Sequence, residues 1–157
     1  MSFIIQSSAF GDGQPIPRRH TGDGEDLSPP LEWRGTPAAS ASLALVVDDP
    51  DAPTNEPWVH WVIYQIAAAS DSLPEGIPPL VRPPFPPGVH QGRNSWKTAG
   101  YRGPAPPKGH GVHRYFFKLF ALDKALELPE GLDKTGLLKA IEPHTIAVAE
   151  MMGTYER

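Results

Sequence analysis

Three strand-length apolar segments constrain the fold of this chain more than any other feature. Residues 42–47 form an unbroken run, Ser-Leu-Ala-Leu-Val-Val, which is typical of a strand buried on both faces. Residues 58–66 and 113–122 alternate with a period of two, and both faces of each segment are largely apolar. We therefore predict three central β-strands at these positions.

The same period assigns the side chains to faces. In the second segment five side chains are expected on one face: Trp58, His60, Val62, Tyr64 and Ile66. In the third segment His113 and Tyr115 share a face. Each histidine stands near the start of its strand, where a side chain can point from the rim of a sheet into a cleft.

The rest of the chain is rich in turn-forming residues. There are 20 prolines and 15 glycines among 157 residues, and a fixed proline φ stiffens loops by lowering the entropy of the unfolded chain. The stretch from 67 to 112 concentrates them, and a connection of that length is normally functional or interrupted by short strands. With no internal repeat or linker, we predict a single domain covering residues 1–157.

Helices are expected after the strands. Apolar residues with helical spacing occur at Leu137, Leu138 and Ile141. That helix is predicted to begin behind a cap at Asp133 or Thr135 and to end at Pro143, and a second short helix is predicted from 145 to 152. Strands followed by helices indicate a mainly β domain, a sandwich with short C-terminal helices.

Composition excludes several functions. A formal charge of −4 and a pI near 5.8 argue against a nucleic-acid binder, which needs a basic face. The first ten residues show neither a positively charged leader nor a long apolar stretch, so we expect no signal peptide, no integral membrane segment and a cytoplasmic location. The absence of cysteine excludes disulfides, thiolate catalysis and cysteine-based zinc sites.

Two histidines, an aspartate and a tyrosine are the candidate functional residues. His60 follows an Asp/Pro-rich turn, and His113 follows a Gly-rich loop. Imidazole, phenol and loop N–H groups can donate hydrogen bonds to the oxygens of a phosphate or sulfate. Asp49 is expected either to pair with a histidine or to bind a protonated ligand oxygen, whereas Asp51 is expected to cap a turn. The alternative is that both histidines are hydrogen-bonded core residues.

Other chemistries have weaker support. Two histidines and one or two aspartates match a zinc or non-haem iron ligand set, but no H-E-x-x-H or H-x-H spacing occurs. No G-x-S-x-G motif is present, and Ser95 lacks a local base. We therefore expect no catalytic residue, no metal and no cofactor. A hydrolase that uses the histidines and Asp49, or an interaction module that acts through its loops, remains an alternative function.

Several ordered segments carry a family resemblance. They are Gly-Asp-Gly-Glu-Asp-Leu-Ser-Pro-Pro-Leu-Glu-Trp at 22–33, Asp-Asp-Pro-Asp-Ala-Pro at 48–53, Val-His-Trp at 59–61, Gly-Tyr-Arg-Gly-Pro-Ala-Pro-Pro at 100–107, His-Arg-Tyr at 113–115 and Gly-Thr-Tyr-Glu-Arg at 153–157. With these, the chain resembles the phosphatidylethanolamine-binding proteins (PEBPs), in particular their bacterial and archaeal branch, which is similar to the Raf kinase inhibitor protein.

The resemblance implies a two-sheet antiparallel sandwich with a shallow anion pocket for phosphatidylethanolamine phosphate, phosphotyrosine or small anions. The pocket would be lined by Asp49, Trp58, His60, His113 and Tyr115, with Gly103 and Pro104 at its rim. Pro53 falls where the family has a cis-proline, and Ala105 replaces a cysteine common in the bacterial branch. The expected function is headgroup binding without catalysis. Modulation of a protein kinase or another signalling partner, and assembly into a homodimer, are open possibilities.

Overall fold

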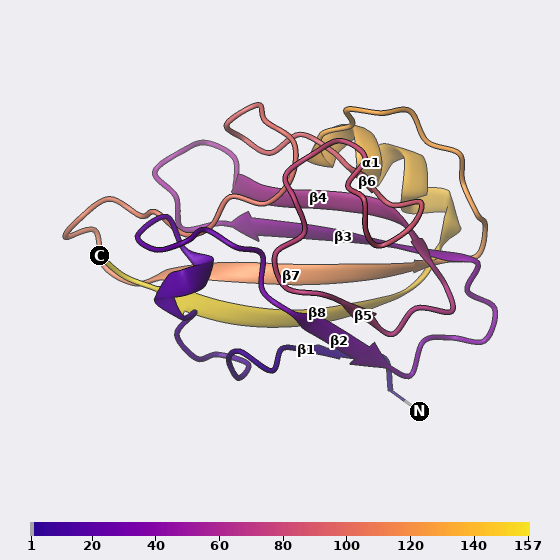
Figure 1. Ribbon diagram of the computed structural model, residues 1–157, viewed down its shortest axis with the longest axis horizontal. Helices are drawn as coiled ribbons and strands as arrows, with labels where there is room; N and C mark the ends of the chain where they lie inside the picture. Colours follow the sequence, from indigo (N-terminus) through magenta and orange to yellow (C-terminus); the bar gives the residue numbers. More distant parts are fainter. Residues whose placement is uncertain (1) are drawn as a thin grey trace.

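The structure, a computed structural model that describes residues 2–157, contains two antiparallel sheets (Figure 1). The larger sheet has the strand order β6-β4-β3-β7-β8, formed by β3 (Ser42–Asp49), β4 (Trp58–Ala67), β6 (His90–Gln91), β7 (His113–Leu122) and β8 (Thr145–Tyr155). The smaller has the order β1-β2-β5, formed by β1 (Ile4–Gln6), β2 (Leu31–Arg34) and β5 (Ser72–Leu73). The helices are α1 (Lys134–Ile141) and two 3-10 turns, η1 (Arg18–His20) and η2 (Glu142–His144). The predicted mainly β, two-sheet fold is confirmed.

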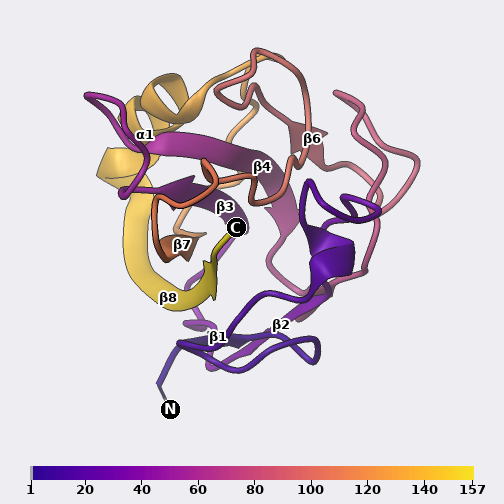
Figure 2. The same cartoon turned by 90° about the vertical axis from the view of Figure 1, so that its left-hand side faces the viewer.

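Both faces of the large sheet are covered. The small sheet packs on one face and α1 on the other, as Figure 2 shows from the end where the C-terminus lies. On the α1 side, Leu137 and Ile141 contact a cluster that includes Val46 and Val62. On the other side, β1 and β2 contribute Ile5 and Trp33 to the larger cluster. All eight residues of β3 are buried as a result, which explains its unbroken apolar run.

The three predicted central strands are confirmed, but the predicted faces of β4 are partly wrong. Val62 and Tyr64 do share the α1 face, whereas Ile66 lies in the cluster on the opposite face. Gln65 has a left-handed φ of 59°, and the β3–β4 pairing shifts register at both ends. One shift skips His60, which has no Cα partner on β3. Such bulges redirect side chains, and a simple period of two cannot anticipate them.

The two C-terminal helix predictions have different outcomes. The first is confirmed, because α1 follows Asp133, whose side chain accepts a hydrogen bond from Gly136 N at 2.8 Å. The second is wrong, because residues 145–155 form β8, which pairs with the whole of β7. Ala149, Met151 and Gly153 face inward with a period of two, and pairing with β7 outweighs the helical propensity of this segment.

Residues 13–16 run along the outer edge of β8. The N–H groups of Gly13 and Ile16 donate to Met152 O and Thr154 O at 2.7 and 2.8 Å, and Thr154 N donates to Gln14 O at 3.0 Å. This segment therefore continues the hydrogen bonding of the large sheet beyond its last strand.

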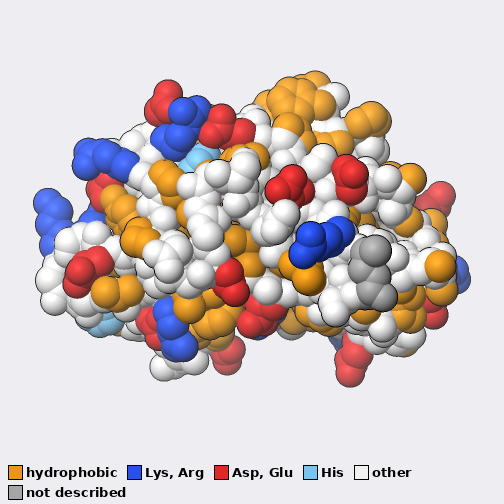
Figure 3. Space-filling view, turned by 90° about the horizontal axis from the view of Figure 1, so that it is seen from below, with side chains coloured by type: hydrophobic (Ala, Val, Ile, Leu, Met, Phe, Trp, Pro, Cys, Tyr) orange, Lys and Arg blue, Asp and Glu red, His pale blue; other side chains and the backbone are white. Residues whose placement is uncertain are grey.

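Charged side chains of both signs are interspersed with apolar ones on the face shown in Figure 3, and no broad basic area appears there. Within residues 2–157, no helix combines the length and hydropathy needed to cross a bilayer.

Candidate functional site

The candidate site lies at one end of the large sheet, the end that faces the viewer in Figure 2. Because the strands are antiparallel, the end of β3 meets the starts of β4 and β7. A cavity of about 270 Å³ opens there, and five predicted residues line it: Asp49, Trp58, His60, His113 and Tyr115. Its other walls are mostly apolar: Ala52, Pro53, Thr54, Trp96, Ala105, Pro106 and Pro107.

The two predicted rim residues lie outside this lining. Gly103 N donates to Asp26 Oδ1 at 2.7 Å, and Pro104 O accepts from Gly22 N at 2.9 Å. Both residues are buried and hold the segment that carries Ala105 to Pro107 over the cavity. They shape the site indirectly, through the backbone.

Asp49 and His113 form a buried pair. Asp49 Oδ2 and His113 Nδ1 are 2.6 Å apart, and the other carboxylate oxygen accepts from Asp51 N at 2.8 Å. Because an ionised carboxylate only accepts, His113 Nδ1 carries the hydrogen. The Asp49–histidine pairing that the sequence left as one of two alternatives is therefore the one observed.

His110 extends this pair and was missed by the sequence reasoning. Its Nδ1 lies 2.6 Å from His113 Nε2, so one hydrogen is shared between the two rings. The sequence feature that could have revealed His110 is the His-x-x-His spacing around Gly111. The φ of 95° at Gly111 turns the chain back on itself.

Asp51 belongs to the scaffold of the site. Its carboxylate accepts from the backbone N, Nε and Nη2 of Arg114, each at 2.9 Å, and these bonds lower the pKa of Asp51. The carboxylate therefore ties the turn after β3 to the start of β7. The turn needs no cis-proline: Pro53 follows a trans peptide, so the expectation for it is wrong, and the cis bond among residues 2–157 is Phe85–Pro86.

His60 is held with one ring nitrogen free. Its Nδ1 lies 2.6 Å from Arg102 O, and since a carbonyl only accepts, Nδ1 carries the hydrogen. Burial lowers the pKa of His60, although the Arg102 bond acts in the opposite direction. The ring is therefore neutral at pH 7, and within residues 2–157 its Nε2 makes no hydrogen bond.

This burial makes a prediction for stability. An unfolded histidine titrates near pH ~6.5, and His60 binds its proton less readily in the folded state, so stability falls as the pH drops below that value. The slope from this one group is at most about 1.4 kcal/mol per pH unit. His60→Phe keeps an aromatic ring but cannot titrate. We expect it to lose less unfolding free energy than the wild type between about pH 6.5 and 5, measured by urea denaturation; equal slopes would contradict this.

Tyr115 presents a buried hydroxyl that has no hydrogen-bond partner among residues 2–157. Burial, assisted by the Asp49 charge, raises its pKa, so the phenol stays protonated and can donate. The ring meets His60 edge-on with centroids 5.1 Å apart. An unpartnered buried hydroxyl costs about 1–3 kcal/mol, so a ligand oxygen here would relieve a real penalty.

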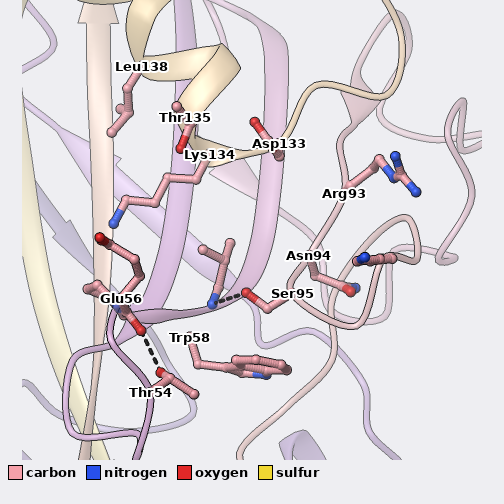
Figure 4. A pocket seen from close by; sticks show the side chains of 13 residues that line it. Thr54, Glu56, Trp58, Arg93, Asn94, Ser95, Asp133, Lys134, Thr135 and Leu138 are labelled. Carbon is pink, nitrogen blue, oxygen red and sulfur yellow. Dashed lines mark hydrogen bonds between the residues drawn. The ribbon is translucent and has the colours of Figure 1, made fainter.

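A second cavity, of about 700 Å³, shares Thr54 and Trp58 with the first (Figure 4). Several of its polar groups are engaged within the protein. Ser95 Oγ accepts from Val59 N at 2.8 Å, Asp133 caps α1, and Lys134 Nζ lies 2.5 Å from Asp48 Oδ2. Arg93 extends away from Lys134 in Figure 4. We therefore assign the candidate site to the smaller cavity, where the buried Tyr115 hydroxyl has no partner among residues 2–157.

Within residues 2–157, no three histidine, aspartate or glutamate side chains converge as metal ligands. Trp96, which the sequence reasoning did not select, forms part of the wall: its ring lies 5.0 Å from His60 and 5.5 Å from Trp58, edge-on to both. The guanidinium of Arg102 lies 4.8 Å from the Trp96 ring centre. The site is thus a small polar floor surrounded by aromatic and proline side chains.

Comparisons with known proteins agree with this architecture. The model of the family described as phosphatidylethanolamine-binding protein matches residues 6–156. A UPF0098 protein of Methanothermobacter thermautotrophicus is 48% identical over 153 residues, covering 98% of each chain. The structure of Escherichia coli YbcL, described as a member of the mammalian PEBP family, has a TM-score of 0.93 and 32% identity, covering 100% of this chain and 99% of YbcL.

A third likeness is to Chlamydia trachomatis CT736, described as a candidate PEBP homologue, with a TM-score of 0.89 and 38% identity over 99% of this chain and 98% of that one. The matched family model covers every strand except the first two residues of β1, and it includes all five cavity-lining residues predicted from the sequence. The chain belongs to the phosphatidylethanolamine-binding protein family.

Proposed function

We propose that this protein binds a small oxyanion, the phosphate or carboxylate of a headgroup, in the 270 Å³ cavity. The observation that carries the proposal is the Tyr115 hydroxyl, a buried donor without a partner, in a cavity that also contains the Asp49–His113 pair. Apolar walls around a few convergent polar groups are typical of ligand sites. The family description, which names phosphatidylethanolamine, supports phosphate as the oxyanion, and phosphoethanolamine carries that phosphate as a free monoester.

The proposed role is binding without chemistry. The aliphatic hydroxyl groups near the pocket are engaged, since Thr54 Oγ1 donates to Glu56 O at 2.5 Å and Ser95 Oγ accepts from Val59 N in the neighbouring cavity. His113 has both ring nitrogens occupied, which leaves His60 Nε2 as the free imidazole nitrogen, with no hydroxyl nucleophile paired to it. Modulation of a kinase or another signalling protein, a homodimer and a cytoplasmic location stay predictions of the sequence.

Titration with phosphoethanolamine tests the proposal. Tyr115→Phe keeps the ring but removes the donor, so we expect about 10–100-fold weaker binding, the range for a hydrogen bond to a charged group. Folding should be preserved or improved, since the change removes an unpartnered hydroxyl. Isothermal calorimetry gives the affinities.

Tyr155→Phe is the matched control, because its hydroxyl donates to Asp23 at 2.7 Å and does not line the cavity. It should bind like the wild type. Absence of binding by the wild type at millimolar ligand, or an unchanged affinity in Tyr115→Phe, would contradict headgroup binding here. Release of inorganic phosphate during the titration would instead favour the hydrolase.

A further inference from the structure

The cavity contains an acceptor as well as a donor. The Tyr115 hydroxyl is buried without a partner among residues 2–157, and His60 Nε2, on a ring whose centroid lies 5.1 Å from that of Tyr115, makes no hydrogen bond to them either. We propose that the pocket selects oxyanions that carry a hydrogen, the monoanion of a phosphate monoester, over equally charged oxyanions that carry none. This inference rests on the proposed function and specifies the chemical class of its ligand.

The tautomer of His60 is fixed by geometry. Arg102 O lies 2.6 Å from Nδ1 and can only accept, so the hydrogen of the neutral ring is on Nδ1 and Nε2 presents a lone pair. The ring cannot readily turn over, because Trp96 and Tyr115 both pack against it edge-on, at 5.0 and 5.1 Å. The cavity therefore offers a fixed acceptor next to the Tyr115 donor.

The charge state of His60 follows from its surroundings. Three carboxylates from β3 and one loop act on it, those of Asp48, Asp49 and Asp26, and His113 and Tyr115 of β7 line the same cavity. The three carboxylates favour a proton on the ring, but burial opposes it more strongly, and the pKa of His60 is lowered. The residue is only 3% exposed, so protonating its ring would place a charge in a desolvated site.

A phosphate monoester fits this pair. Its second pKa is near ~6, so around pH 5.5 it is mainly a monoanion with one P–OH group. That group can donate to His60 Nε2 while another oxygen accepts from Tyr115. A phosphodiester or a sulfate ester has the same charge but no hydrogen, so it would turn a lone pair toward a lone pair and leave the acceptor unpartnered.

Three probes of equal charge separate these cases: phenyl phosphate, methyl phenyl phosphate and phenyl sulfate. All share an aromatic group suited to the apolar walls, and calorimetry or the fluorescence of Trp58 and Trp96 reports binding. At about pH 5.5 we expect phenyl phosphate to bind at least about tenfold more tightly than either of the others. Equal affinities for the three would overturn the inference.

The pH dependence gives a second, independent readout. Raising the pH from about 5.5 to 8 removes the ligand hydrogen, so phenyl phosphate should lose about two orders of magnitude in affinity, while phenyl sulfate stays nearly constant. Equal losses of affinity for phenyl phosphate and phenyl sulfate would show that the titrating proton is on the protein, and would overturn the inference. Binding of none of the probes would instead overturn the proposed function itself.

His60→Phe supplies the matched variant. It removes the acceptor and keeps an aromatic ring, so we expect the three probes to bind within about threefold of one another. The steep pH dependence of phenyl phosphate should also disappear. Retention of the wild-type preference would overturn the role of His60, and the comparison of probes on the wild type remains decisive if this variant folds poorly.

Discussion

Asp49→Asn is expected to lower the free energy of unfolding by about 2–3 kcal/mol and to weaken phosphoethanolamine binding more than tenfold. The asparagine oxygen can still accept from Asp51 N, but its NH2 group then faces the N–H of His113 Nδ1. Two donors oppose each other, so His113 must change tautomer or rotate away from the cavity. Both changes also disturb the hydrogen bond to His110.

Asp51→Asn is the control for this change, because it lies two residues further along the same turn. Its bonds to Arg114 are partly solvent-exposed, with the Arg114 side chain 50% accessible, so we expect a loss of only about 0–1 kcal/mol. Urea denaturation and calorimetry measure both variants. Similar losses for the two would show that the buried pair contributes no more than a surface ion pair.

Gly103→Ala is expected to lower the free energy of unfolding by about 3 kcal/mol or more, equivalent to about 6–12 °C in Tm. A Cβ at this position would lie 2.2 Å from His20 O and 2.7 Å from Asp26 Oδ1. Neither atom is free to move, since His20 O accepts from the Tyr101 hydroxyl and Asp26 Oδ1 accepts from Gly103 N. The segment that positions Arg102 O against His60 would shift, so binding should weaken as well.

Gly109→Ala provides the comparison. Gly109 has a φ of 76° and nothing within 4 Å of an added Cβ, so only backbone strain opposes the alanine. We expect a loss of about 1 kcal/mol. Thermal denaturation followed by circular dichroism distinguishes the two variants, and a Gly103→Ala Tm as high as that of Gly109→Ala would contradict the steric explanation.

The central strands could be predicted because burial on both faces leaves a direct mark on composition. β7 has the predicted bounds, His113–Leu122, and β3 and β4 extend the predicted segments by one or two residues. β8 could not be predicted in the same way. Its inward residues are alanine, methionine and glycine, which favour no strand, and its structure depends on pairing with β7.

The candidate site, too, could be predicted only in part. Its residue types and strand-end positions were readable from the sequence, and so was the idea of an aspartate–histidine pair. Which nitrogen of His60 is free was not readable, because that depends on Arg102, 42 residues away, and on a bulge in β4. The contribution of Trp96 was hidden as well, since it comes from a loop that reaches the cavity only in the folded chain.

The segment at residues 13–16 has a consequence for aggregation. A sheet edge with unpaired N–H and C=O groups is a template on which other chains can add strands. Here one edge strand, β6, has only two residues, and the other, β8, has its second half covered by Gly13 to Ile16. The same hydrogen bonds that join the two ends of the chain thus keep the edge beside the binding site from recruiting a neighbouring molecule.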